Sequence, residues 1–328
     1  MINLCLFGAG RIGKIHAANV ALNRRARLRY VTDVYEDAAV ALAREYGAEV
    51  TDTETALADS TIDAVIIASS TDTHAPLLET ACRAGKQVFC EKPVDLSSDR
   101  VRAALKTVEE TETTLLVAFN RRFDPNFAAL QKAISEGRIG RVEQVILTSR
   151  DPGPPPAEYI KVSGGLFRDM MIHDFDMARW LLGEEPTEVY AVGSCLVDPE
   201  IGALGDVDTA AVTLKTGSGA ICHITNSRRA SYGYDQRIEV FGSEGMLRAA
   251  NVTDTTVELS NGDGVITDKP MHFFLERYMD AYRIELDHFI DCLEDGKTPL
   301  AGGEDGLRSL LLADAATESA KTGRPVKL

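Results

Sequence analysis

The sequence lacks the marks of several protein classes. It has no apolar run of the roughly 18 residues that span a bilayer, and no basic region precedes its first apolar stretch, so we expect neither a membrane span nor a signal peptide. Asp and Glu total 50 against 35 Lys and Arg, which gives a formal net charge of −15. This excess of negative charge disfavours nucleic-acid binding, because such binding releases counterions through basic side chains.

Cysteine and histidine are scarce and widely spaced. The six cysteines form no CxxC pair, and the six histidines form no HExxH or comparable metal-binding pattern. Most cysteines lie in apolar segments, which is typical of reduced core residues in a cytoplasmic protein. The chain also shows no internal repeat and no low-complexity segment. We therefore expect a cytoplasmic protein without a disulfide framework and without a metal site.

A glycine-rich motif stands near the start of the chain, between an apolar strand and a helix. The sequence Gly8-Ala9-Gly10-Arg11-Ile12-Gly13 follows the strand at 2–7 and opens a helix over 14–22. In this setting GxGxxG glycines permit a tight turn, and the helix start offers amides to a pyrophosphate. Asp33 follows the second strand, where an acid accepts bonds from ribose hydroxyls and repels a 2′-phosphate. The motif predicts dinucleotide binding, with NAD favoured over NADP.

The rest of the chain divides into two patterns. Strands alternate with helices up to residue 120, which predicts an N-terminal α/β Rossmann domain over residues 1–120 with a parallel sheet. After Val142 strands follow one another with short turns, which predicts a large, mostly antiparallel open sheet. Residues 121–328 are therefore expected to form an α+β domain for substrate binding and oligomerisation. Its C-terminal helix is compatible with packing back on the first domain.

Two loops at strand ends of the first domain are candidates for lining a ligand crevice. The first runs from Ser69 through Thr71 to His74; His74 there either contacts ligand or simply begins a helix. The second is Glu91-Lys92-Pro93, in which Pro93 confines Lys92 to extended geometry. Such a lysine can bridge nicotinamide and a substrate hydroxyl, although taken alone a solvated lysine is the more common interpretation. Asn120-Arg121 marks the exit from this domain.

The segment from Gly164 to Trp180 is predicted to be a loop that opens one helix ending at Gly183. Asp169, His173 and Asp176 then share one face, at i, i+4 and i+7. A carboxylate beside an imidazole can make that ring a general base, whereas the alternative is a solvated helix face. The preceding loop, Arg150–Pro156, places Asp151 either near a polyhydroxylated ligand or in a rigid connector.

These motifs together resemble the Gfo/Idh/MocA oxidoreductases over essentially the whole chain. Within that family the proline loop and the match from Glu158 through Trp180 look most like the bacterial inositol 2-dehydrogenases. The resemblance implies oxidation of myo-inositol to an inosose with NAD as acceptor, and commonly a homotetramer. It places the family's cofactor loop on Gly8 to Gly13, its ribose-binding acid on Asp33, and its catalytic residues on Lys92, Asp169 and His173. Together with the loops described above, we expect cofactor contacts from Gly8, Gly10, Arg11, Ile12, Gly13, Asp33, Ser69, Thr71, His74, Glu91, Lys92 and Arg121. We expect substrate contacts from Lys92, Asn120, Arg121, Asp151, Asp169, His173, Tyr232 and Tyr234.

A mechanism follows from these assignments as a hypothesis. His173 accepts the hydroxyl proton, Asp169 orients its ring, and Lys92 donates to the developing alkoxide. The alternatives within enzymes are a dehydrogenase for scyllo-inositol or an aldose, and NAD-retaining hydrolysis or epimerisation. The alternative from another class is a non-catalytic, NAD-dependent ligand sensor on the same fold.

Overall fold

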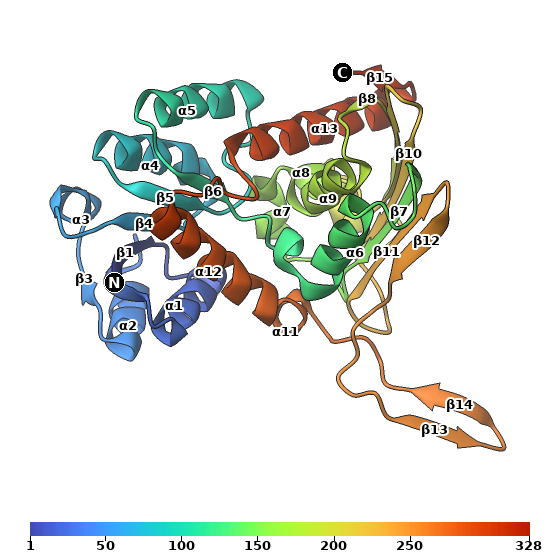
Figure 1. The fold of residues 1–328 in the computed structure, drawn as a ribbon, viewed down its shortest axis with the longest axis horizontal. Helices are drawn as coiled ribbons and strands as arrows, with labels where there is room; N and C mark the ends of the chain where they lie inside the picture. The colour runs from blue at the N-terminus through green and yellow to red at the C-terminus, as the bar shows by residue number, and fades with distance from the viewer. The chain divides into compact units, whose positions relative to one another are not determined.

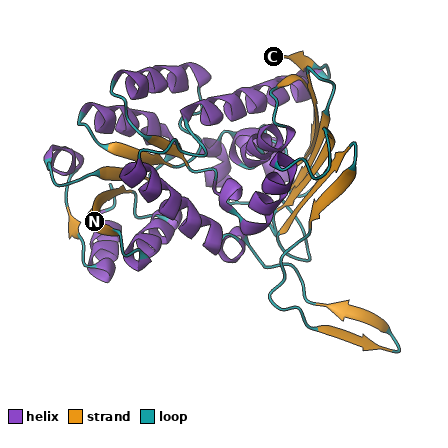
Figure 2. Cartoon of the chain, viewed as in Figure 1, coloured by secondary structure: helices purple, strands orange, loops and turns teal.

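The computed structural model describes all residues from Met1 to Leu328. It divides into two compact units, each discontinuous in sequence. The first unit contains residues 1–123 and 280–310, and the second contains 124–279 and 311–328. The first break thus lies three residues after the boundary expected at 120, and a segment of the C-terminal region groups with the first unit. Figure 1 gives the element labels, and Figure 2 distinguishes helices from strands.

The first unit is built on a six-stranded sheet in which every neighbouring pair is parallel. Its strands, in the order β3-β2-β1-β4-β5-β6, are β3 (Glu49–Val50), β2 (Ala26–Thr32), β1 (Ile2–Phe7), β4 (Ala64–Ile67), β5 (Gln87–Cys90) and β6 (Leu115–Val117). The central strand β4 is completely buried, as its continuous apolar sequence requires in a sheet covered on both faces. The strand order reverses between β1 and β4, and ligands bind at the carboxyl ends of strands beside such a reversal.

Helices cover both faces of this sheet. In Figure 1, α1 (Arg11–Leu22) and α2 (Glu36–Tyr46) lie on one face, while α4 (Thr71–Arg83) and α5 (Ser98–Glu110) lie on the other. Right-handed crossovers produce this division when the strand order reverses. The remaining elements of the unit are α3 (Thr53–Ala58), the 3-10 turn η1 (Asn120–Phe123) and most of α12 (Met279–Asp295).

The second unit is built on a seven-stranded sheet that is antiparallel except where β7 meets β10. In sheet order the strands are β12 (Gly245–Ala249), β11 (Asp235–Gly242), β7 (Val142–Arg150), β10 (Ile221–Ser227), β9 (Thr209–Thr216), β8 (Pro186–Ser194) and β15 (Val326–Lys327). Buried and exposed residues alternate along β9 and β10, so one face forms a core and the other is open. The mostly antiparallel sheet expected for this region is confirmed.

Helices of the second unit pack on the buried face of its sheet, with α9 against β7 and β10 and α6 against β12. The helices are α6 (Pro125–Ser135), α7 (Ala157–Ser163), α8 (Gly165–Asp169), α9 (Ile172–Leu182), α10 (Pro199–Ala203), α11 (Phe274–Arg277) and α13 (Gly303–Thr322), the last of which begins among residues of the first unit. A separate hairpin, β13 (Glu258–Asn261) with β14 (Gly264–Thr267), extends from this unit as a two-stranded arm (Figure 1). No helix combines the length and the apolar character that a membrane crossing requires.

The single helix expected from Gly164 to Gly183 is wrong, because the segment folds as α8 and α9 with a break between them. The amides of Met170 and Met171 both donate to the carbonyl of Leu166, at 3.0 and 2.9 Å. The second of these bonds spans one residue more than an α-helical bond, so the helical register is lost there. The predicted end holds: Gly183 terminates α9 with a φ of 66°.

A buried carboxylate fixes the connection between β8 and β9. Asp208 accepts bonds from the backbone amides of Leu196, Val197 and Asp198 at 2.8, 2.8 and 2.9 Å. Burial alone would raise the pKa of this carboxyl, but the bonds from the amides outweigh burial and lower the pKa to about 2. A folded-state pKa below the unfolded value contributes stability above about pH 4, and this contribution is lost as pH falls toward 2.

We therefore expect Asp208→Asn to lower the free energy of unfolding at pH 7 by about 2 kcal/mol. The difference from wild type should shrink steadily between pH 4 and pH 2, where the native carboxyl also becomes neutral. Urea unfolding followed by circular dichroism at several pH values measures it, with Asp263→Asn in the exposed β13–β14 turn as the matched control. An Asp208→Asn deficit that stays constant down to pH 2 would contradict the assignment.

Candidate active site

The glycine-rich loop follows β1 and makes a turn that only glycine permits at two points. Gly8 has a φ of 106°, and a Cβ there would lie 2.4 Å from the carbonyl oxygen of Ala68. A Cβ on Gly13 would lie 1.9 Å from the carbonyl oxygen of Gly8. Gly10, by contrast, faces open space at the start of α1. The backbone is closely packed at Gly8 and Gly13, whereas open space remains at Gly10, where a pyrophosphate would meet the amides of the helix start. The loop therefore fits a dinucleotide.

Asp33 follows β2 at the same edge of the sheet. Its Oδ2 accepts a hydrogen bond from the amide of Ala9 at 2.6 Å, and its Oδ1 accepts one from the amide of Tyr35 at 2.8 Å. These bonds fix the carboxylate beside the glycine-rich loop and leave lone pairs for other donors. A fixed negative charge at this position suits the two ribose hydroxyls of NAD and repels the 2′-phosphate of NADP.

We expect Asp33→Ser to reduce the preference for NAD over NADP by about tenfold or more, because the repelling charge is removed. The ratio of kcat/KM for the two cofactors measures this change. Asp37→Ser is the matched control, since Asp37 is an exposed acid in the first turn of α2. An unaltered cofactor ratio in Asp33→Ser would show that another residue sets the preference.

The loop after β4 is internally bonded rather than loose. The hydroxyls of Ser69 and Thr73 lie 2.6 Å apart, and Thr71 begins α4. His74 is 2% exposed, and its Nδ1 lies 2.8 Å from the carbonyl oxygen of Pro93 while its Nε2 lies 3.1 Å from that of Ser69. The ring thus stands between the loops that follow β4 and β5, with both nitrogens facing the backbone.

The Lys92 turn, residues Glu91–Pro93, follows β5. The peptide between Lys92 and Pro93 is cis, and the Lys92 side chain is half-buried. The Oε1 of Glu91 lies 2.8 Å from the Nε2 of His16 on α1. Beyond the next strand, the side chains of Asn120 and Arg121 are buried in η1. The predicted cofactor residues of the first unit thus gather at one edge of its sheet, where its strands end.

In the second unit, His173 lies in the first turn of α9 and is partly exposed, whereas the three residues after it are buried. Asp169 ends α8; its Oδ1 accepts a bond from the hydroxyl of Tyr159 at 2.8 Å. The guanidinium of Arg228, which is 1% exposed, lies 3.4 Å from the Oδ2 of Asp169. A phenol and a buried cation therefore fix the carboxylate that we expect to orient His173.

The residue after His173 ties α9 to the sheet. Asp174 is buried and accepts bonds from the hydroxyl of Ser149 on β7 and the side-chain amide of Asn226 on β10, at 2.5 and 2.9 Å. This anchors the turn of helix that carries His173. Asp176 is completely buried and lies 3.9 Å from Arg179, so the alternative of a solvated helix face is wrong for this residue.

The remaining predicted substrate residues are bonded or packed inside the second unit. The amide of Asp151 donates to the carbonyl of Ser227 at 3.0 Å. The hydroxyl of Tyr232 donates to Asp235 at 2.6 Å and accepts from Arg150 at 2.8 Å. Tyr234 is buried, and its ring packs edge-on against Tyr278 and Phe273. Substrate contacts from Asp151, Tyr232 and Tyr234 therefore stay predictions.

Several residues of these networks were not singled out in the sequence, among them His16, Tyr159, Asp206 and Arg228. His16 had a local signal, because it follows Gly13 by three residues and so shares the buried side of α1. Asp206 accepts from the amide of Leu166 at the start of α8 with both carboxylate oxygens, at 3.0 and 3.1 Å. Arg228 directly follows β10 and contacts Asp169, and no sequence pattern predicts this contact.

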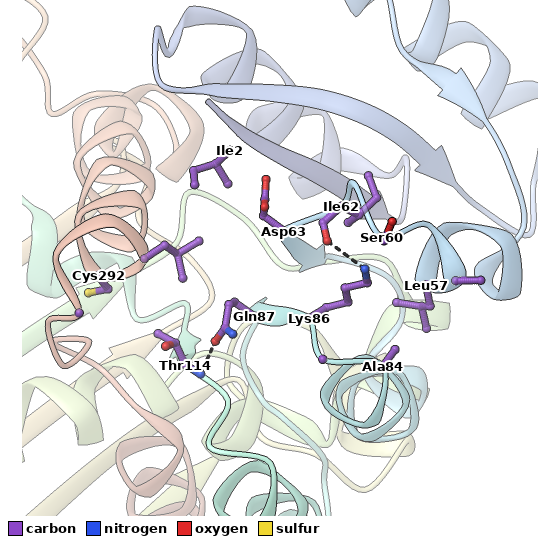
Figure 3. Close-up of a pocket in the computed structure, with 14 residues that line it drawn as sticks. Ile2, Leu57, Ser60, Ile62, Asp63, Ala84, Lys86, Gln87, Thr114 and Cys292 are labelled. Atoms are coloured by element: carbon purple, nitrogen blue, oxygen red, sulfur yellow. Dashed lines mark hydrogen bonds between the residues drawn. The ribbon is translucent and has the colours of Figure 1, made fainter.

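A hollow of about 650 Å³ lies at the opposite edge of the first unit's sheet, where β1, β4 and β5 begin. Figure 3 shows Lys86 and Gln87 at its wall. The Nζ of Lys86 donates to the carbonyls of Asp59 and Ile62 at 2.7 and 2.9 Å, so this lysine has a structural role in holding the backbone before β4. The carboxyl ends of the strands, with the glycine-rich loop and the Lys92 turn, lie at the other edge.

Comparison with known proteins finds relatives for both units of the chain. Residues 2–119 match the NAD-binding Rossmann fold of the Gfo/Idh/MocA oxidoreductase family, and residues 131–328 match that family's C-terminal alpha/beta domain. An inositol 2-dehydrogenase of Rhizobium meliloti is 53% identical, over 98% of each chain. The crystal structure of a myo-inositol dehydrogenase from Corynebacterium glutamicum has a TM-score of 0.96 at 43% identity, covering 100% of this chain and 99% of that one. A Lactobacillus casei scyllo-inositol dehydrogenase, crystallised with NAD(H) and scyllo-inositol, has a TM-score of 0.93 at 30% identity, covering 100% and 99%.

Proposed function

Because the chain belongs to the Gfo/Idh/MocA oxidoreductase family, we propose that it oxidises myo-inositol to 2-keto-myo-inositol with NAD as the acceptor. The observation that carries this proposal is the 53% identity to an inositol 2-dehydrogenase over nearly the full length of both chains. The cofactor loop and Asp33 support the choice of NAD, because the loop has room for a pyrophosphate and the carboxylate suits a free ribose.

The chain's own residues divide the work of alcohol oxidation. When bound, NAD supplies the acceptor for the hydride. His173 takes the proton of the reacting hydroxyl, and Asp169 holds the ring in the orientation that this transfer needs. Lys92 donates a hydrogen bond to the oxygen as negative charge develops on it, which stabilises the transition state more than the neutral alcohol. Arg121, Asn120 and Asp151 are assigned to the remaining hydroxyls, the contacts that distinguish isomers.

A panel of cyclic polyols and aldoses with NAD, followed by the absorbance of the reduced nicotinamide, tests the proposal. We expect the highest kcat/KM with myo-inositol. The second candidate is scyllo-inositol, since the Lactobacillus casei enzyme was crystallised with that isomer. A protein that reduces NAD with no polyol or sugar would fit the ligand sensor instead. Conversion of a substrate without net NADH would indicate epimerisation or hydrolysis.

We assign self-association to the open face of the second unit's sheet. This face exposes Tyr190, Val192, Phe241 and Met246, a set of large apolar side chains on β8, β11 and β12. A sheet face of this kind is commonly buried against a copy of the same chain. The resemblance implies a homotetramer, and we propose that this face forms part of its interfaces. Light scattering tests the assembly: a solution mass equal to the 35.6 kDa chain would contradict it.

The state of the cysteines supports a reducing, cytoplasmic setting. All six are free, and five of them are buried. Burial raises the pKa of the Cys5 thiol to about 12, and it raises the pKa values of Cys90 and Cys222 as well. Thiols with raised pKa values carry little thiolate at neutral pH and are therefore poor nucleophiles. They behave as core residues, as the sequence predicts.

A further inference from the structure

Two buried histidines contact the Lys92 turn, and they come from different helices. His16 lies on α1 and meets the side chain of Glu91, while His74 lies on α4 and meets the carbonyl of Pro93. In Figure 1, α1 and α4 cover opposite faces of the first unit's sheet. The residues directly before and after Lys92 are therefore each bonded to an imidazole, from the two sides of the sheet.

The His16 contact is well defined. Its ring is completely buried, with Phe89 edge-on at a centroid distance of 4.9 Å and Tyr282 at 6.0 Å. Its Nδ1 is buried without a hydrogen-bond partner. A neutral ring with its proton on Nε2 donates to Glu91 and leaves only a lone pair unpaired, which costs less than an unpaired N–H. The ring is thus arranged to hold one oxygen of Glu91.

The His74 contact has a different geometry. Both ring nitrogens face carbonyl oxygens, and the shorter distance, 2.8 Å, is from Nδ1 to Pro93. A neutral imidazole has a single N–H, so it donates to one of the two carbonyls at a time. A bond from Nδ1 fixes the Lys92 turn, whereas a bond from Nε2 fixes the backbone of Ser69 within the loop after β4. Because the ring is 2% exposed, the geometry favours a role inside the protein over the predicted cofactor contact.

We propose that His16 and His74 are positioning residues that hold the Lys92 turn from its two sides and thereby aim the Lys92 ammonium at the reacting oxygen. The proposal rests on the function proposed above, in which Lys92 stabilises the developing alkoxide. Alignment of such a donor within about 1 Å decides its effect, so a loosened turn lowers kcat although the lysine itself is intact.

Asparagine and glutamine test this geometry because each reproduces one ring nitrogen. The amide nitrogen of asparagine lies as many bonds from Cα as Nδ1 does, and that of glutamine lies as many bonds from Cα as Nε2 does. Glu91 is held by an Nε2 and Pro93 by an Nδ1. His16→Gln and His74→Asn should therefore keep the turn in place, whereas His16→Asn and His74→Gln should release it. Each pair provides its own matched control of similar polarity.

Two further variants, His16→Leu and His74→Leu, remove both ring nitrogens. We expect kcat to fall roughly tenfold in these leucine variants, in His16→Asn and in His74→Gln, and to stay within about threefold of wild type in His16→Gln and His74→Asn. Hydrogen exchange of residues 88–95 in the NAD-free protein gives a second readout that needs no turnover. Deuterium uptake there should rise only in the variants that release the turn. Melting temperatures of the Asn and Gln variants at each position show whether stability differs between them.

Equal turnover and equal exchange for Asn and Gln at both positions would overturn the proposal, as would leucine variants that behave like wild type. If wild-type protein reduces NAD with no polyol or sugar, the proposed function fails by itself. In that case hydrogen exchange still tests the role of the two histidines. Higher deuterium uptake of residues 88–95 only in the variants that release the turn, such as His16→Asn and His74→Gln, would support the role, and its absence would contradict it.

Discussion

His173→Ala is expected to reduce kcat for polyol oxidation by at least about a hundredfold, because a positioned general base contributes a factor of that size or more. The dissociation constant of NADH should stay within about twofold, since the residues that fit the dinucleotide all belong to the first unit. The helix itself should survive, because Asp174 still ties α9 to Ser149 and Asn226. The loss should therefore appear in the chemical step.

Steady-state kinetics with myo-inositol and fluorescence titration with NADH measure the two quantities. His223→Ala is the matched control: His223 is a half-buried histidine on β10, bonded to Thr213 at 3.1 Å. A pH profile adds a second check, since wild-type kcat should fall as pH drops and the base becomes protonated, and this limb should vanish without the imidazole. Turnover near that of wild type would remove His173 as the base.

The sequence predicted the fold of the first unit closely because its signals are local. Each strand ends in turn residues, and each helix follows within a few positions, so a parallel sheet with covered faces was the consistent solution. The second unit was predicted only as a mostly antiparallel sheet, and its strands β12, β14 and β15 are short and carry little pattern in the sequence. The break between α8 and α9 had no signal at all, because Met170 and Met171 are ordinary helix residues.

The candidate site likewise contains residues with local sequence signals and residues without them. The geometry of Gly8, Gly13 and Asp33 was predictable because it follows from their own backbone positions and from neighbouring strand ends. The contact between His16 and Glu91 joins residues 75 positions apart, and that between Arg228 and Asp169 joins residues 59 apart. Such pairs depend on how helices and strands pack, which a single sequence does not specify. The residues that hold the functional side chains through long-range contacts could therefore be identified only from the three-dimensional structure.

Lys92→Met is expected to lower kcat by about a hundredfold to a thousandfold, the range found when one donor to a developing oxyanion is removed. Methionine matches the stem of lysine up to Cε, and so keeps its packing, but it supplies no proton and no charge. Lys92→Arg should recover little of the loss, because the planar guanidinium presents its donors in a different geometry from the compact ammonium. Lys14→Met, at an exposed position of α1, controls for loss of a positive charge near the cofactor loop.

The double variant decides whether Lys92 and His173 act on the same event. If the lysine stabilises the alkoxide that forms as His173 takes the proton, the two substitutions remove parts of one step. Lys92→Met with His173→Ala should then be far less damaging than the product of the single effects, as is usual for residues that work as a unit. Fully multiplicative losses would instead mean that Lys92 acts apart from the proton transfer, in holding cofactor or substrate. A lysine that is merely solvated would leave the kcat of Lys92→Met close to that of the Lys14→Met control.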